Sequence, residues 1–188
     1  MSQYVVVAAT MTIAQPRLRS YLRAPVAPAS TWSEQDWAGV CDPWPRYRAE
    51  LPSAIAECDR WIKGDYADLL RDFDELTLRH DDATDSLLLE FDTRADFQLP
   101  TLIWACCVLR GVTPFMADDD SGCATITTDW DDDAELRLRL SPNRSAFLDP
   151  DRDRAAIAKA KDADFDVRLA ISDADPDESG ADVLDRLT

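Results

Sequence analysis

Five stretches of the chain carry the apolar patterns of β-strands. Residues 4–12 form a β-branched apolar run without polar alternation, which predicts a strand buried on both faces. Residues 87–91 predict a second central strand. Residues 124–128 and 135–140 predict an antiparallel hairpin, because the second arm alternates leucine with charged residues. Apolar and charged residues also alternate over 165–171, which predicts a last strand.

Longer periodic stretches predict four main helices. Residues 51–62 and 66–76 place apolar side chains at the i, i+3, i+4 and i+7 positions of one helical face. Residues 100–110 are apolar on nearly every side and too short to span a bilayer, so this helix is expected to be the most deeply buried. Asp149-Pro150 is typical of a helix start, and the fourth helix is predicted to end near Lys161.

Together these patterns predict a core. Almost complete burial is expected for nine side chains: Val6, Leu88, Leu102, Ile103, Trp104, Cys106, Cys107, Leu138 and Val167. The Pro- and Trp-rich segment 24–46 is predicted to be an irregular connection with one short helix capped by Ser33. We expect its three tryptophans to pin the segment to the core.

The order of these elements predicts the fold class. Strands and helices do not alternate regularly, which argues against a doubly wound parallel sheet. We therefore predict an α+β fold, with a mixed sheet of about five strands and helices packed mainly on one face. Residues 1–171 form this single acidic domain. Residues 172–188 are expected to be a loose acidic tail with at most a final helical turn at 183–187.

Charge narrows the classes of partner. The chain has 37 acidic and 20 basic residues, a net charge of −17 at pH 7. Such a field repels nucleic acids and anionic membranes and attracts cationic surfaces, so neither nucleic acid nor membrane is an expected partner. Adaptation to a salt-loving host would also produce an acidic chain, and this alternative stays open.

The cysteines indicate a reducing compartment. There are five, an odd number, without a C-x-x-C pair, and Cys106 and Cys107 lie inside an apolar run. This pattern fits neither a disulfide framework nor a zinc site, so free, mostly buried thiols and a cytoplasmic location are expected. No basic residues precede the apolar run 4–13, which favours a strand over a signal peptide there.

No catalytic or metal motif stands out. His80, the one histidine, is placed near the end of the second predicted helix, where an exposed capping role is expected. The strings Asp173-x-Asp175-x-Asp177 and Asp129-x-Asp131-x-Asp133 lack the glycine and glutamate of a calcium loop. Glu90 is the first candidate for a carboxylate pair, but we expect it to face solvent or pair with an arginine. We predict no cofactor, no metal and no enzyme activity.

Two acidic runs are the candidate binding residues. Asp118, Asp119 and Asp120 form one run, and Asp129, Asp131, Asp132 and Asp133 surround Trp130 in the other. They are expected to lie at opposite ends of the strand between them. Trp130 in an acidic turn resembles an interface anchor, although it could equally fold back onto the core.

These features favour a binding protein for a basic partner. The leading hypothesis is an immunity protein that blocks a bacterial toxin acting on nucleic acid, since such toxins need a cationic substrate face. The alternatives are an Asp/Glu-based or metal-dependent hydrolase and an acidic scaffold or assembly protein. The sequence does not determine the identity of the partner or the oligomeric state.

Overall fold

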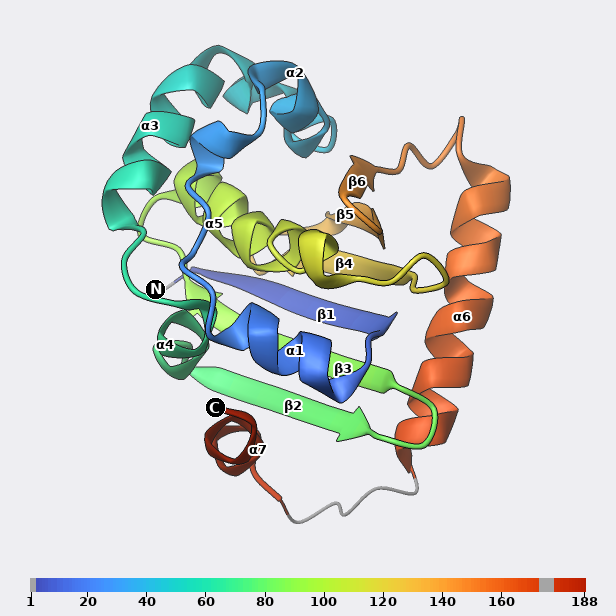
Figure 1. Cartoon of the computed structure of the whole chain (residues 1–188). Helices are drawn as coiled ribbons and strands as arrows, with labels where there is room; N and C mark the ends of the chain where they lie inside the picture. The colour runs from blue at the N-terminus through green and yellow to red at the C-terminus, as the bar shows by residue number, and fades with distance from the viewer. Residues whose placement is uncertain (1–2, 173–177) are drawn as a thin grey trace.

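The computed structural model describes residues 3–172 and 178–188 and has an α+β fold around one six-stranded sheet (Figure 1). The strands lie in the order β2-β3-β1-β4-β5-β6, and all neighbouring pairs are antiparallel. Their bounds are β1 Tyr4–Thr12, β2 Glu75–Asp81, β3 Ser86–Arg94, β4 Gly122–Thr128, β5 Asp131–Ser141 and β6 Arg144–Phe147. The α+β class is confirmed. The prediction of about five strands in a mixed sheet is corrected to six strands with no parallel pair, because three of the five neighbouring pairs are hairpins.

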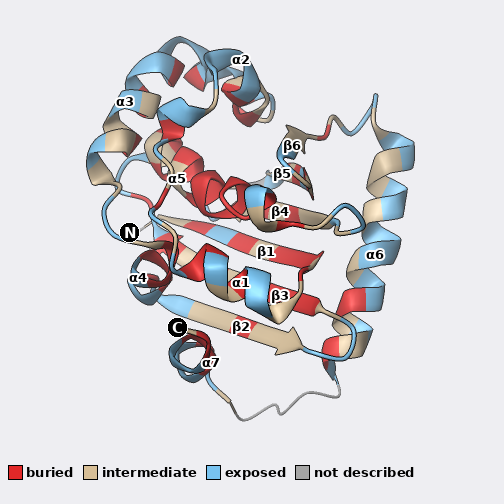
Figure 2. Ribbon diagram, viewed as in Figure 1, coloured by how far each residue is buried: buried red, intermediate tan, exposed pale blue. Residues whose placement is uncertain are grey.

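Most helices cover one face of the sheet, as predicted. The helices are α1 Gln15–Leu22, α2 Glu34–Trp37, α3 Leu51–Trp61, α4 Tyr66–Arg71, α5 Gln98–Arg110, α6 Arg154–Ser172 and α7 Gly180–Leu187, with short 3-10 turns in the connections. Figure 2 shows α5 as the most completely buried of them, which confirms the sequence-based expectation. By contrast, α6 crosses the opposite face and is largely exposed.

Strand β1 alternates, contrary to the prediction of burial on both faces. Val5 and Val7 are fully buried beneath the helices, whereas Val6 points to the opposite face and is 36% exposed. The physical reason is that α6 covers only one end of that face, near Thr10. Trp104 is also less buried than predicted. The other seven predicted core residues are buried.

The segment 66–81 is a helix followed by a strand rather than a single helix ending near His80. Asp65 and Asp68 form a capping box that starts α4, and the helix ends at Arg71. Phe73 then stacks on Phe91, with ring centroids 4.0 Å apart, and the chain continues as β2. Because β2 is an edge strand with one covered face, tertiary pairing decides its structure rather than helical periodicity.

The stretch 165–171 is helical, so the predicted last strand is wrong. Helix α6 begins later than Asp149-Pro150 and continues past Lys161 to Ser172. Its buried residues, Val167 and Ile171, are four positions apart and therefore lie on one helical face. Phe165 and Leu169, the other apolar residues of the apparent alternation, are exposed.

The C-terminal segment is not the loose tail that the composition predicted. Residues 173–177 lie outside the described part of the chain, but α7 packs against β2. Val183, Leu184 and Leu187 are each at most 2% exposed. The amphipathic helix α7 therefore completes the core beside the edge strand β2, and it belongs to the domain.

Segment 24–46 is attached to the core as predicted. Ser33 caps α2 through a capping box with Asp36. Trp37 and Trp44 are almost fully buried. The guanidinium of Arg110 lies 4.3 Å from the ring centroid of Trp37 and donates a hydrogen bond to the Asp36 carbonyl at 2.8 Å. This contact ties the segment to α5.

Candidate functional site

An acidic hollow beside the β4–β5 hairpin is the best candidate site. Three segments that are distant in sequence enclose about 430 Å³: residues 39–43, the start of β5, and the linker 148–151. Six carboxylates line it: Asp42, Asp131, Asp133, Glu135, Asp149 and Asp151. No basic side chain is found among its described lining residues.

Specific hydrogen bonds hold two of these carboxylates in place. Asp131 accepts a hydrogen bond from the indole Nε1 of Trp44 at 3.1 Å. Asp149 accepts from the backbone N–H groups of Arg152 and Asp151, at 2.9 and 2.8 Å. These two bonds lower the pKa of the Asp149 carboxyl, since they favour its charged form. The carboxylates are therefore pre-positioned by the local fold.

Arginines at the rim offset only part of the negative charge. Arg48 pairs with Asp42 at 3.0 Å, Arg154 pairs with Asp151 at 3.4 Å, and Arg137 contacts Glu135. The first two pairs are well exposed, and exposed ion pairs contribute little stability. The remaining lining acids, Asp131, Asp133 and Asp149, form no ion pair within the described part of the chain.

The spacing of the acids suits an extended cationic group. In the described residues, no three His, Cys, Asp or Glu side chains converge closely enough to hold a metal ion. The hollow instead spreads its carboxylates over a volume that can admit a lysine or arginine side chain. An arginine guanidinium offers five donors to such acceptors. Chemically, the lining carboxylates can accept hydrogen bonds from a cationic side chain.

The hairpin tip differs from the predicted acidic turn. The turn is shorter than expected, because β5 already begins at Asp131. Asp129 is exposed and accepts a hydrogen bond from the backbone N–H of Tyr4 at 2.8 Å. Trp130 is partly buried against the core, and its Nε1 is buried without a partner. The structure thus gives Trp130 the packing role that the sequence left open, while Asp132 lies outside the described side chains.

The two predicted acidic runs are not brought together. They flank opposite ends of β4, as expected from the length of the strand. Asp118 and Asp119 are exposed, and Asp120 accepts a hydrogen bond from the backbone N–H of Ala117 at 2.6 Å. Of the predicted residues whose side chains the structure describes, only Asp131 and Asp133 line the acidic hollow.

Four acids of the hollow were missed by sequence reasoning. Asp42, Glu135, Asp149 and Asp151 come from segments separated by up to about a hundred positions. The only local signal is that Asp42 precedes Pro43 and that Asp149 and Asp151 flank Pro150, a composition typical of turns. Their convergence depends on tertiary packing.

A second group of carboxylates lies on the open face of the sheet. Glu90 forms an ion pair with Arg168 of α6 at 2.9 Å, which confirms the expected arginine pairing. Glu75 lies directly across from Asp92 on the neighbouring strand. Partial burial, followed by the charges of Glu75, Asp74 and Glu90, raises the pKa of Asp92.

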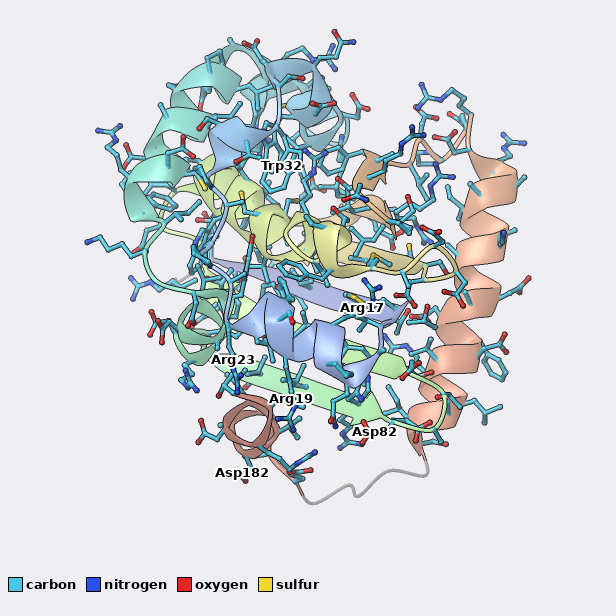
Figure 3. The ribbon with its side chains drawn as sticks, viewed as in Figure 1. Arg17, Arg19, Arg23, Trp32, Asp82 and Asp182 are labelled. Carbon is cyan, nitrogen blue, oxygen red and sulfur yellow. The ribbon has the colours of Figure 1, made fainter. Side chains whose placement is uncertain are left out.

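The single histidine is committed to structural contacts. His80 lies on β2, not at a helix end, and its side chain is buried rather than exposed as predicted. Its Nδ1 is 2.7 Å from Asp82, whose side chain is labelled in Figure 3, and its Nε2 is 2.8 Å from the carbonyl oxygen of Ile13. Both ring nitrogens are therefore engaged, and neither contacts a nucleophile.

All five cysteines are free, and Cys123 alone of them is partly exposed. Among the described helices, none has the length and apolar character needed to cross a bilayer.

A scan against protein-family models finds no matching family, and searches of curated proteins and solved structures find no significant match.

Proposed function

We propose that this chain is a cytoplasmic binding protein that neutralises a basic protein partner. The observation that carries the proposal is the acidic hollow, with six carboxylates and no basic lining residue among those described. A lysine or arginine of the partner enters it and replaces the repulsion between neighbouring carboxylates with charge-assisted hydrogen bonds.

The charge of the whole chain supports the same function. A net charge of −17 attracts a cationic protein over roughly a Debye length, which raises the association rate more than the affinity. Association should therefore slow several-fold between low and physiological salt, while dissociation changes little. Association that does not depend on salt would remove this support.

The class of partner follows from chemistry. Proteins that act on nucleic acids carry a cationic face for phosphate, and an acidic domain can cover that face. We therefore propose an immunity protein for a bacterial toxin that acts on nucleic acid. An Asp/Glu-based or metal-dependent hydrolase has less support, because Glu90 is paired with Arg168 on an open sheet face. An acidic scaffold protein would have no single specific basic partner.

The direct test asks whether a basic protein is encoded directly beside this chain in its source genome, and it uses such a protein as the partner. Co-expression with this chain should rescue cells from its toxicity, and the two purified proteins should form a complex of fixed stoichiometry. Failure to rescue, together with no binding, would overturn the proposal. Turnover of a substrate by this chain alone would favour the hydrolase.

A matched pair of variants locates the interface. Asp133→Lys reverses an exposed charge in the hollow, and Asp119→Lys makes the same change at the other end of β4. Asp133→Lys should weaken binding by about 2 kcal/mol, whereas Asp119→Lys should change only the association rate. Equal effects of both variants would indicate that only overall charge matters and that the hollow is not the interface.

A further inference from the structure

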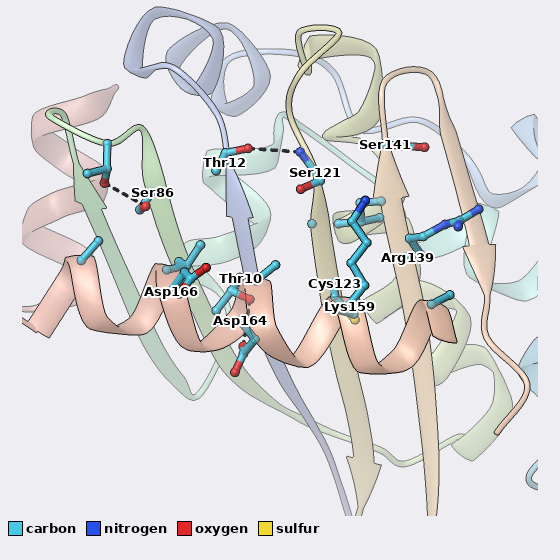
Figure 4. Close-up of a pocket in the computed structure, with 18 residues that line it drawn as sticks. Thr10, Thr12, Ser86, Ser121, Cys123, Arg139, Ser141, Lys159, Asp164 and Asp166 are labelled. Atoms are coloured by element: carbon cyan, nitrogen blue, oxygen red, sulfur yellow. Dashed lines mark hydrogen bonds between the residues drawn. The ribbon is translucent and has the colours of Figure 1, made fainter. Parts of the chain in front are cut away.

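A separate groove runs between α6 and the sheet. Its volume is about 540 Å³, and Figure 4 shows α6 crossing in front of the strands with the groove residues between them. It lies on the face opposite the main helical layer, away from the acidic hollow. None of its lining residues belongs to the proposed partner-binding site, so it requires an explanation of its own.

The groove exists because small side chains face each other. Ala160, Ala163 and Ala170 of α6 line the groove on one side, and Gly122 and Cys123 of β4 line it on the other. Larger apolar side chains meet where Val167 and Ile171 pack against Leu88. Besides this apolar cluster, the hydrogen bond from Thr10 to Asp164 and the ion pair of Glu90 with Arg168 hold the 19-residue helix on the sheet. Natural interiors are normally close-packed, so an unfilled apolar space of this size is typical of a ligand pocket.

The dimensions of the groove suit a single extended chain. Its lining runs along α6 from Ala156 to Ala170, roughly 20 Å at ~1.5 Å per residue. Across the sheet it spans from β3 to β5, roughly 14 Å at ~4.8 Å between strands. Dividing the volume by either length leaves a cross-section of roughly 30–40 Å². That cross-section is sufficient for a single hydrocarbon chain.

One end of the groove is cationic. Lys159 and Arg139 line it, both are exposed, and neither forms an ion pair with any residue that the structure describes. In Figure 4, Lys159 extends from α6 toward the end of β4, where Ser121 lies. After the hydrogen bonds from Asp149 and Arg152, the charge of Arg139 also helps to lower the pKa of Asp153, so this cation is partly shared with an acid.

Two acids line the groove itself, Asp164 and Asp166. Asp164, near the middle, accepts a hydrogen bond from the Thr10 hydroxyl at 2.8 Å and pairs with Arg168 at 3.1 Å. Asp166 lines the groove farther along α6. The charge distribution therefore places an anionic head group at the Lys159 end and excludes one from the other end.

We propose that this groove binds an amphipathic monocarboxylate with a linear hydrocarbon tail. The carboxylate lies between Lys159 and Arg139, and the tail lies along the alanines of α6. Lipid-like ligands commonly occupy such apolar sites, which have a few polar groups at one end that set orientation. This inference does not depend on the proposed partner.

The test measures binding of decanoate to the full chain, below its micelle concentration, by equilibrium dialysis. One decanoate per chain is expected to bind. The Lys159→Ala/Arg139→Ala variant should weaken binding by about tenfold or more, which corresponds to the loss of two charged contacts. The matched control Lys161→Ala/Arg154→Ala removes two α6 cations that do not line the groove, and it should bind normally.

Cys123 provides an independent readout at the groove. It is the one partly exposed cysteine, so a thiol reagent should modify it selectively in the folded protein. Bound decanoate should slow this modification, and decylamine, which has the same tail and a positive head, should not. No decanoate binding by dialysis would overturn the proposal. Equal binding of decylamine, or equal losses in both double variants, would also overturn it.

Discussion

Replacing Asp92 by asparagine should stabilise the protein at neutral pH. Asp92 lies on the open sheet face directly across from Glu75, and the described structure gives it no ion pair or hydrogen bond. Its pKa is raised by partial burial and then by the charges of Glu75, Asp74 and Glu90. A carboxyl whose pKa is raised on folding is less stable when charged in the folded state than in the unfolded state.

The magnitude follows from the cross-strand geometry. Like charges directly opposite each other in a sheet cost up to about 1 kcal/mol. Glu90 adds little, since Arg168 already compensates its charge. The Asp92→Asn variant should therefore gain about 0.5–1 kcal/mol at pH 7. For a chain of this length, the melting temperature should rise by about 1–4 °C.

The effect of Asp92→Asn on stability should depend on pH, and the direction of this dependence is itself a test. The repulsion between Asp92 and Glu75 lowers the free energy of unfolding while Asp92 is charged. This loss disappears as the pH falls to about 3, where the carboxyl groups become protonated. Urea denaturation at pH 7 and pH 3 should thus show a gain at the higher pH alone. Glu135→Gln, which breaks a pair with Arg137 on the same face, is the control and should not stabilise. A loss of stability in Asp92→Asn, or an equal gain at both pH values, would refute the reasoning.

Three further predictions test the core. Trp130→Ala should lower the free energy of unfolding by about 2–3 kcal/mol, because Trp130 packs on the core. Lost partner binding with unchanged stability would instead make Trp130 an interface anchor. Leu184→Ala should cost about 2–4 kcal/mol in urea denaturation, since Leu184 lies on the packed face of α7 and is fully buried. An unchanged midpoint would contradict the docking of this helix. Thiol titration in denaturant without reductant should count five free cysteines, whereas the folded protein should expose Cys123 alone; a lower count in denaturant would indicate disulfides.

Local patterns alone determined several elements. The all-round apolar run of α5 required burial on every side, and the Leu/Arg alternation of β5 required one covered face. The Ser33 cap was readable because capping depends on residues a few positions apart. The opposite placement of the two acidic runs followed from strand length.

Tertiary structure decided what local periodicity leaves ambiguous. The stretch 165–171 satisfies both a strand alternation and a helical i, i+4 pair, and packing of Val167 and Ile171 against Leu88 selects the helix. Val6 has the side chain of a core residue but is exposed, because α6 covers only part of its face. Burial depends on which elements pack above a strand, and the residues of the strand do not carry that information.

The candidate sites also combine features that the sequence predicts with features that only tertiary packing decides. Net charge predicted an attraction to basic partners, but Asp42, Asp131 and Asp149 meet only because three distant segments converge. The groove beneath α6 depends on the pairing of alanines with small strand residues across the fold. Composition sets the overall electrostatic field, which sums over all charges, whereas a site needs particular atoms within contact distance. Only the folded chain provides those distances.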